Sequence, residues 1–363
     1  MRVVPARAAL AWRLRRHGLA PRPAGGSPAA VAERLCGLHA QVMSSADLSL
    51  LARLGDHHPG ALPQALWHDR TLVKLWAARG TLHLLPAASL PTWLGALGTL
   101  RKFGNNGHPD TERICEAVAT ALHHRVLTRR ELSAEVGRLT GSPRLGSWVA
   151  SSWGSDLKAA SFRGLLCFTD SGFTSPEHWL GPHARPAPAP KSLRSVVRLF
   201  LRSYGPTIPG QLTRWWLGPP RDRLGRSLLA TVEEETTPVR FAGHEAVVLT
   251  ADLAELTEAD EPSSCRLLPA FDPWVLGMPR AEPFIDPRHL PQVFRPAGRI
   301  APVLLTDGRV TGTWTHHVTS RRTTVELAPF ASVSAAVRRA MTTEAERLAA
   351  HLGSALELRW HQP

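Results

Sequence analysis

The chain has 363 residues, of which 43% are hydrophobic. This length and composition are sufficient for a buried core and suggest two to four domains. Its net charge is +13, and only four of its 43 basic residues are lysines, so arginine supplies the positive field. No apolar run reaches the roughly 20 residues that span a bilayer, so we expect no membrane-spanning segment. The arginine-rich N-terminus lacks the apolar core of a secretory signal, which favours a cytoplasmic protein.

The charge is uneven along the chain. Residues 231–262 contain nine acidic side chains and one arginine, so the positive excess lies elsewhere. A GC-rich genome would explain arginine in place of lysine, but not the excess over acidic residues. Because guanidinium groups bind phosphate in a planar, bidentate geometry, the charge favours a polyanionic partner such as nucleic acid.

The first region, residues 1–104, is predicted to contain helices followed by a hairpin. Ser27 is a good cap and Pro28 a good first residue for the second helix. Apolar and polar residues alternate over 71–85, on both sides of 78–80, which indicates a β-hairpin. Together these elements are typical of a winged helix-turn-helix unit. The helices are expected over residues 5–17, 28–38, 46–54 and 63–68.

Two further units, residues 105–185 and 186–262, repeat this order of elements at roughly 90-residue spacing. Thr128 and Glu131 form a capping box at the start of a helix, and residues 181–190 form a proline-rich linker. The second unit is expected to have helices at 110–124, 128–139 and 147–163 and a hairpin at 164–174. The third is expected to have helices at 191–202, 209–217 and 221–231 and a hairpin at 239–250.

The last region, residues 263–363, is expected to form a small β-barrel-like domain with a covering helix. Asp307-Gly308 is a strong hairpin signal between two of its strands. The strands are expected at 303–305, 309–314, 323–327 and 356–360, and the helix at 332–352. The predicted fold class is therefore α+β, with three tandem winged helix-turn-helix motifs followed by this C-terminal domain.

Two polar side chains, His39 and Gln41, interrupt the apolar run that ends the second predicted helix. Neighbours on one helical face lie three or four residues apart, whereas alternate residues of an extended segment point the same way. If the helix ends near Leu38 and the chain then straightens, both side chains enter one cleft. The alternative is that both lie in a turn between helices, where the histidine makes hydrogen bonds within the protein and the glutamine lies on the surface.

Neither the cysteines nor the histidines have the spacing of a metal site. The four cysteines lie far apart among apolar neighbours, which predicts small core residues and no disulfide framework. Adjacent histidines occur at 57–58, 123–124 and 316–317, but adjacent residues rarely ligate one ion, and no His-Glu-x-x-His pattern exists. We therefore expect no metal and no cofactor.

Three spaced segments, residues 76–86 (WAARGTLHLLP), 267–277 (LLPAFDPWVLG) and 294–314, resemble signatures of a known family. Through them nearly the whole chain is similar to the winged-helix DNA glycosylases typified by AlkZ and YcaQ. The resemblance implies three tandem winged-helix motifs and a C-terminal β-domain around a basic concave channel. It also implies a partner, double-stranded DNA with alkylated bases.

The resemblance implies hydrolysis of the N-glycosidic bond of alkylated purines, notably N7-alkylguanine, including bulky and crosslinked adducts. For AlkZ-like members it also implies self-resistance in antibiotic producers. The catalytic motif of the family is Gln, one apolar residue, then Gln or Asp, and it aligns with His39-Ala40-Gln41. Gln41 matches this motif and His39 departs from it. Since histidine can hydrogen-bond a water and can take a proton, we expect both residues to be catalytic.

The chemistry expected follows from the leaving group, because an N7-alkylated purine is cationic and its departure leaves an oxocarbenium-like sugar. We expect Gln41 to orient a water and contact the sugar, and His39, neutral near pH 7, to accept the proton of the water. No lysine lies near His39 in the sequence, so we expect a monofunctional enzyme that leaves an abasic site.

DNA contacts are expected from the hairpins and the β-domain. The candidates are Arg79, His83, Arg299, Trp314, Arg321 and Arg322. The alternative for Trp314 is a position in the core, and the alternative for residues 321–322 is a solvated turn. Asp272 is expected to be a cap or turn residue.

The function predicted is that of a monomeric, nucleoid-associated DNA glycosylase. The alternative is a non-enzymatic winged-helix transcription regulator, against which the three units and the lack of a coiled-coil repeat argue.

Overall fold

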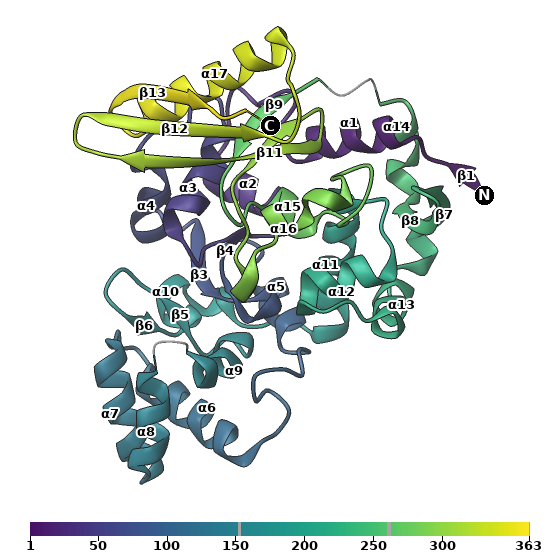
Figure 1. The fold of residues 1–363 in the computed structure, drawn as a ribbon. Coiled ribbons are helices and arrows are strands. Elements are labelled where there is room, and N and C mark those ends of the chain that lie inside the picture. Colours follow the sequence, from purple (N-terminus) through teal and green to yellow (C-terminus); the bar gives the residue numbers. More distant parts are fainter. Residues whose placement is uncertain (152–153, 260–262, 363) are drawn as a thin grey trace.

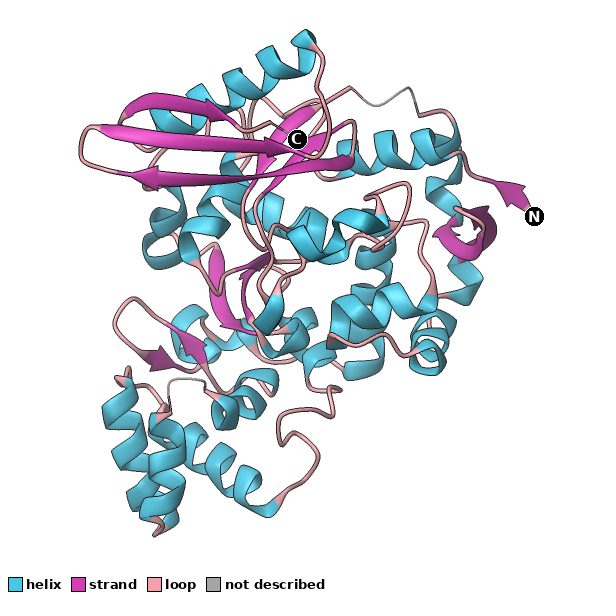
Figure 2. Ribbon diagram, viewed as in Figure 1, coloured by secondary structure: helices cyan, strands magenta, loops and turns pink. Residues whose placement is uncertain are grey.

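The computed structural model describes residues 1–151, 154–259 and 263–362. In Figure 1 the first unit lies in the middle, between the C-terminal sheet at the top and the helices of the second unit at the lower left. The third unit lies to the right, beside the N-terminus. The strands form three sheets (Figure 2). No described helix has the length and apolar character needed to cross a membrane.

The first unit has the predicted order of helices and hairpin. Ser27 caps the second helix by accepting the N–H of Ala30. This helix ends at Arg34, earlier than expected, and the chain then straightens into a short strand at Leu38–His39. The elements are α1 (Ala6–Arg16), α2 (Pro28–Arg34), β2 (Leu38–His39), α3 (Met43–Leu51), α4 (Ala61–Pro63), η1 (Gln64–His68), β3 (Leu72–Trp76), η2 (Ala78–Gly80), β4 (Leu82–Pro86) and α5 (Leu90–Leu97).

The second unit departs from the prediction in its third helix. Instead of one helix over 147–163, one helix ends at Ala150 and another begins at Lys158, with residues 152–153 outside the described part. Gly154 has a φ of 61°, and a Cβ there would lie 2.4 Å from the Trp76 ring, so the chain turns where it meets the first hairpin. The elements are α6 (Pro109–Ala121), α7 (Arg129–Thr140), α8 (Pro143–Ala150), η3 (Ser155–Leu157), α9 (Lys158–Phe162), β5 (Cys167–Phe168), β6 (Phe173–Thr174), α10 (Pro176–Leu180) and η4 (Pro182–Ala184).

The third unit again has helices followed by a hairpin. The predicted capping box of the second unit is present at Thr128 and Glu131, and here α12 begins at Pro209 as predicted. The order of elements is therefore confirmed in each unit, whereas winged-helix geometry stays a prediction. The elements are α11 (Ala189–Tyr204), α12 (Pro209–Leu217), α13 (Asp222–Ala230), η5 (Glu233–Glu235), β7 (Thr236–Phe241), β8 (His244–Leu249), η6 (Thr250–Asp252) and α14 (Leu253–Thr257).

The hairpins join larger sheets. Those of the first and second units share a five-stranded sheet with the order β2-β4-β3-β5-β6. The third pairs in parallel with β1 (Arg2–Val3). Trp12 and Leu14 of α1 share a core with Val239 and Leu268. The first helix therefore packs with the third unit and the C-terminal region, although the predicted boundary at residue 104 assigns it to the first unit.

The C-terminal region is an open sheet, so the expected barrel-like closure is wrong. Among the described residues its five strands have the order β13-β12-β11-β10-β9, with unpaired edges at both ends. The helix α17 covers one face, where Met341 and Leu348 pack with Trp314 and Leu327. The apolar face is thus buried without closure. The elements are β9 (Cys265–Leu268), α15 (Pro273–Gly277), η7 (Pro287–His289), α16 (Leu290–Val293), η8 (Pro296–Gly298), β10 (Val303–Thr306), β11 (Arg309–Val318), β12 (Arg322–Pro329), α17 (Ala335–His351) and β13 (Ala355–Trp360).

A buried ion pair joins the first unit to the C-terminal region. Arg53, just after α3, donates to both carboxylate oxygens of Asp272, at 2.8 and 2.7 Å, and the Ser49 hydroxyl donates to the same carboxylate at 2.9 Å. The side chains of Arg53 and Asp272 are 1% and 0% exposed. Asp272 also accepts the N–H of Trp274, which confirms the predicted cap. The turn before α15 is therefore fixed against α3.

We expect Arg53→Ala to lower the free energy of unfolding by about 3–5 kcal/mol, because it leaves the Asp272 carboxylate buried without its cation. The matched control is Arg138→Ala, since Arg138 pairs with Glu135 while 69% exposed. That variant should lose less than about 1 kcal/mol in the same urea titration. Equal, small losses in both variants would show that the buried pair does not hold the two regions together.

Candidate active site

The strands β2 and β4 bring two histidines together. His39 and His83 are direct cross-strand partners, so their side chains lie on one face of the sheet, with ring centroids 5.6 Å apart. The pairing continues past the strand, where the N–H of Ala40 donates to the carbonyl of Leu82 at 2.8 Å. The backbone is thus extended through Ala40, as the sequence pattern required.

Gln41 lies at the exposed end of this segment. Its Oε1 accepts a hydrogen bond from the N–H of Leu82 at 3.4 Å, so the amide contacts the first residue of β4. Its side chain is exposed, whereas His39 is 6% exposed. Because alternate residues of an extended segment point the same way, a buried imidazole and an accessible amide follow one another on one side of the chain.

Phe271 covers the His39 ring. The two rings stack with centroids 4.9 Å apart and planes 19° apart. Phe271 has a φ of 59° and directly precedes the buried Asp272, so the ion pair of that residue fixes the turn that presents the phenyl ring. His39 Nδ1 is buried and has no hydrogen-bond partner in the described part of the chain. No neighbouring carboxylate or carbonyl therefore stabilises an imidazolium there.

Burial, and secondarily the charge of Arg79, lowers the pKa of His39 to about 3. Burial also lowers the pKa of His83 well below its ordinary value, with Arg79 and His39 adding to the effect. Both imidazoles are therefore uncharged at neutral pH, in agreement with the expectation for His39. A neutral imidazole of this kind is a hydrogen-bond acceptor and a weak base.

Arg79 and His83 form a hydrogen-bonded group behind His39. Arg79 donates to the carbonyl of Trp215 in α12 at 2.6 Å and approaches His83 Nε2 at 3.4 Å. The His83 Nδ1 donates to the carbonyl of Thr81 at 2.9 Å, and the ring is 3% exposed. The expected DNA contact of His83 is therefore wrong, because the ring is buried and both nitrogens have partners. Arg79 is partly buried and serves as the charged neighbour of His39.

The other expected DNA contacts divide into core and surface. Trp314 is 2% exposed and its indole N–H donates to the carbonyl of Leu268 at 2.8 Å, so it is a core residue and its expected DNA contact is wrong. Arg299 and Arg321 are exposed. Arg322 is 61% exposed and pairs with Glu357 at 2.8 Å. The last two arginines lie at the turn of the long β11–β12 hairpin, which projects to the left in Figure 1.

A family model for AlkZ-like DNA glycosylases matches residues 32–351. This chain belongs to that family. The match includes the β2 segment, the whole sheet that contains it and all of α17, and it confirms the resemblance seen in the sequence. The chain is therefore a DNA glycosylase and not a regulator without enzymatic activity.

A curated protein and a solved structure support the same family. An interstrand DNA cross-link repair glycosylase of Streptomyces sahachiroi is 34% identical over 334 residues, which are 85% of this chain and 87% of that protein. The solved structure of the S. sahachiroi DNA glycosylase AlkZ superposes with a TM-score of 0.87 at 30% identity. That alignment covers 99% of this chain and 100% of the other.

Sequence reasoning missed Phe271 and Arg53. Both signals were indirect: Phe271 adjoins the expected cap Asp272, and Arg53 is an arginine among buried leucines at the end of a helix. Their roles depend on pairing across more than 200 residues of sequence, since Arg53 and Asp272 are 219 positions apart. No local pattern reports such a contact.

We expect the imidazole of His39 to show no titration near pH 6.5 in a pH series of NMR spectra and to protonate only near pH 3. Phe271→Ala should raise this pKa, because burial is its main cause. The matched control is Phe330→Ala, which removes a phenyl ring stacked on His289 at 4.0 Å and should leave His39 unchanged. A midpoint near 6.5 for His39 in the wild type would contradict the assignment.

The same pKa makes stability depend on pH. The unfolded chain binds a proton at position 39 near pH 6.5, whereas the folded chain binds it only near pH 3, so acidification through pH 6.5 lowers stability. His39→Gln removes this contribution, and its urea midpoint should fall less than that of the wild type between pH 7 and pH 5. An equal fall in both proteins would contradict the low pKa.

Proposed function

We propose that this DNA glycosylase releases N7-alkylated purines, above all bulky guanine adducts, by hydrolysis at the His39-Ala40-Gln41 segment. The observation that carries the proposal is the buried, uncharged His39 held under Phe271 next to an accessible Gln41. An N7-alkylated purine is already a cationic leaving group and needs no acid to depart. A site without a strong base or acid suits such a substrate and leaves undamaged bases intact.

Gln41 is the residue that positions the water and the sugar. Its Oε1 accepts from Leu82 and keeps a second lone pair, while its NH₂ group remains a donor. The carbonyl oxygen receives a hydrogen bond from the water, and the amide NH₂ group donates to an oxygen of the sugar. Holding the water on the open face of C1′ supplies the positioning on which this reaction depends.

His39 receives the proton of the water. The N-glycosidic bond breaks with its electron pair moving to N9, which neutralises the purine and leaves a positive sugar. The water oxygen then bonds to C1′ and becomes strongly acidic, so even an imidazole with a pKa near 3 accepts its proton. Because its pKa is low, His39 then releases the proton to solvent and is neutral again for the next turnover.

The product we propose is an abasic site in an unbroken strand. A lyase step needs an amine nucleophile, and the chain has only four lysines. Three of them contact groups of the protein other than His39: Lys102 donates to the carbonyl of Leu217, Lys74 lies over Phe168 and Lys158 over Phe103.

The S. sahachiroi relative is described as a cross-link repair enzyme, which supports bulky and crosslinked guanine adducts as substrates here. We propose antibiotic self-resistance or base-excision repair as the setting. In it the enzyme acts as a nucleoid-associated monomer on double-stranded DNA. Arg299, Arg321 and Arg322 are proposed to contact phosphates.

We expect purified enzyme to release the modified base from duplex DNA with N7-methylguanine or, separately, a bulky N7-guanine adduct. Gln41→Ala and His39→Ala should each lower the single-turnover rate by about 10²–10⁴-fold, because each removes a group that acts on the attacking water. Gln64→Ala, an exposed glutamine in the same unit, is the control and should keep the wild-type rate. Unchanged release by the Gln41 and His39 variants would place the active site elsewhere.

We expect no covalent complex when borohydride is added during base release, because no amine attacks the sugar. The strand should break only after heat or alkali treatment of the product. A borohydride-trapped complex that disappears on substitution of one of the four lysines would contradict the monofunctional mechanism.

A further inference from the structure

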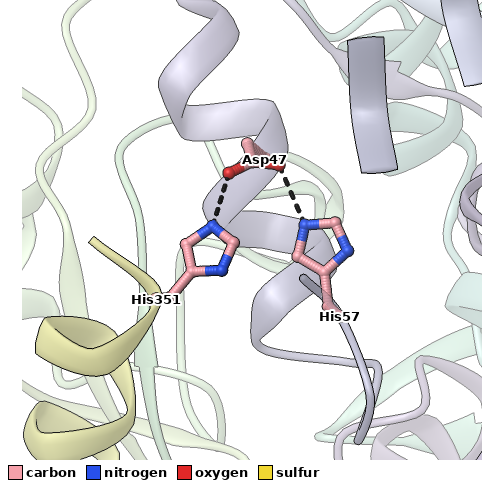
Figure 3. A group of neighbouring side chains, drawn as sticks. All are labelled: Asp47, His57 and His351. Atoms are coloured by element: carbon pink, nitrogen blue, oxygen red, sulfur yellow. Dashed lines mark hydrogen bonds and ion pairs between the residues drawn. The ribbon is translucent and has the colours of Figure 1, made fainter. Parts of the chain in front are cut away.

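Asp47, His57 and His351 form a second cluster of polar side chains (Figure 3). Asp47 Oδ1 lies 2.9 Å from His57 Nε2, and Oδ2 lies 2.7 Å from His351 Nε2. The two imidazole rings stack with centroids 5.2 Å apart and planes 23° apart. All three potential ligand atoms lie within 4.8 Å of one another. Two rings thus direct the same kind of nitrogen at one carboxylate.

The three residues come from separate parts of the chain. Asp47 is in α3, His57 is in the loop after it, and His351 is the last residue of α17. The histidine side chains are 1% and 4% exposed, whereas Asp47 is 25% exposed. Burial holds the rings in place, and the cluster is open to water on the carboxylate side.

The donor set is that of a transition-metal site. Two imidazole nitrogens and one carboxylate oxygen suit zinc and its neighbours, whereas calcium and magnesium prefer oxygen ligands. Tetrahedral zinc with ligand bonds of about 2.0–2.1 Å sets its ligand atoms roughly 3.3 Å apart. Asp47 contacts the two histidines through different oxygens, at 2.9 and 2.7 Å, and the three ligand atoms all lie within 4.8 Å of one another. Rotation of these side chains toward a common centre would therefore bring the ligand atoms to this spacing.

The ring nitrogens that face away from Asp47 have no partner in the described part of the protein. Nδ1 of His57 and Nδ1 of His351 are both buried without a hydrogen-bond partner among the described residues. The nearby Arg347 donates to the carbonyl of Leu54, which occupies part of its guanidinium group. An ion on the Nε2 atoms would leave these Nδ1 atoms as they are, so the argument for an ion is the convergence of two Nε2 atoms and one carboxylate at a single point.

We propose that Asp47, His57 and His351 bind one divalent transition-metal ion of the zinc class, with water in the fourth position. The ion ties α17 to α3, the helix that begins two residues after Gln41. It therefore fixes the C-terminal layer to the helix behind the candidate active site and takes no part in base release. The sequence-based expectation of no metal considered only adjacent histidines and the His-Glu-x-x-His pattern, whereas Asp47 and His351 lie 304 positions apart.

The test is zinc titration of the full, tag-free chain after chelator treatment and dialysis, followed by calorimetry. The wild type should bind one equivalent, and its thermal midpoint should rise with free Zn²⁺. His57→Ala and His351→Ala should weaken binding at least 100-fold and abolish the rise. His58→Ala is the matched control, because this neighbour of His57 is exposed, contacts the carbonyl of Pro59 and should behave as wild type.

A second variant and a second probe keep the test decisive if the alanine variants fold poorly. Asp47→Asn keeps the size of the side chain and a hydrogen-bond acceptor but loses the anionic ligand, so zinc affinity should fall in a folded protein. Co²⁺ in the wild type should give the strong visible absorption of a four-coordinate ion, and His351→Ala should lose it. Zinc binding that survives in all three variants, or no binding by the wild type, would overturn the proposal and leave a hydrogen-bonded tie.

Discussion

The buried pair of Arg53 and Asp272 is the contact on which the candidate active site depends. A lone charge in this dry environment would cost several kcal/mol, so each residue requires the other. The pair fixes the turn in which Phe271 adopts its positive φ, a conformation that costs about 1–3 kcal/mol and persists only where its surroundings enforce it. Phe271 in turn covers His39. The first unit thus supplies the proposed catalytic residue, and the C-terminal region supplies its cover.

Burial also explains how a histidine can serve at position 39, where the resemblance to the family implies a glutamine. Under Phe271 and near Arg79, the imidazole has a pKa of about 3 and stays uncharged at physiological pH. An uncharged imidazole presents a hydrogen-bond acceptor to a water, as the carbonyl of a glutamine does. The substitution therefore keeps the electrostatic character that we propose for the site, and it adds only a proton acceptor at the moment of attack.

Local signals in the sequence were sufficient to predict the helices and strands, but not to predict how these elements assemble into sheets. The cap at Ser27, the capping box at Thr128 and the alternation of 71–85 each act within a few residues, and the structure confirms all three. The fusion of two hairpins into one sheet and the open C-terminal sheet depend on contacts between distant segments. The sequence therefore predicted separate wings and a barrel.

The candidate site likewise has local features that the sequence predicted and features set by distant contacts that it did not predict. The spacing of His39 and Gln41 correctly indicated an extended segment, because alternation is a local property. The exposure of a residue is not local, and for this reason His83 and Trp314 were placed on the DNA surface although they are buried. Arginine and histidine, which usually lie at the surface, are here also used inside the protein, as at Arg53 and His39.

Acidic residues also neutralise arginines nearer the surface. Within residues 231–259, Glu235 pairs with the partly exposed Arg194 and Arg198, and Asp252 pairs with Arg16. The net charge of +13 is therefore not spread evenly over the surface. Attraction of a polyanion depends on the arginines whose charge is not compensated locally. This arrangement suits the function that we propose, because contacts to phosphates would hold the enzyme on undamaged DNA without sequence preference, while the proposed chemistry takes place at the His39-Ala40-Gln41 segment.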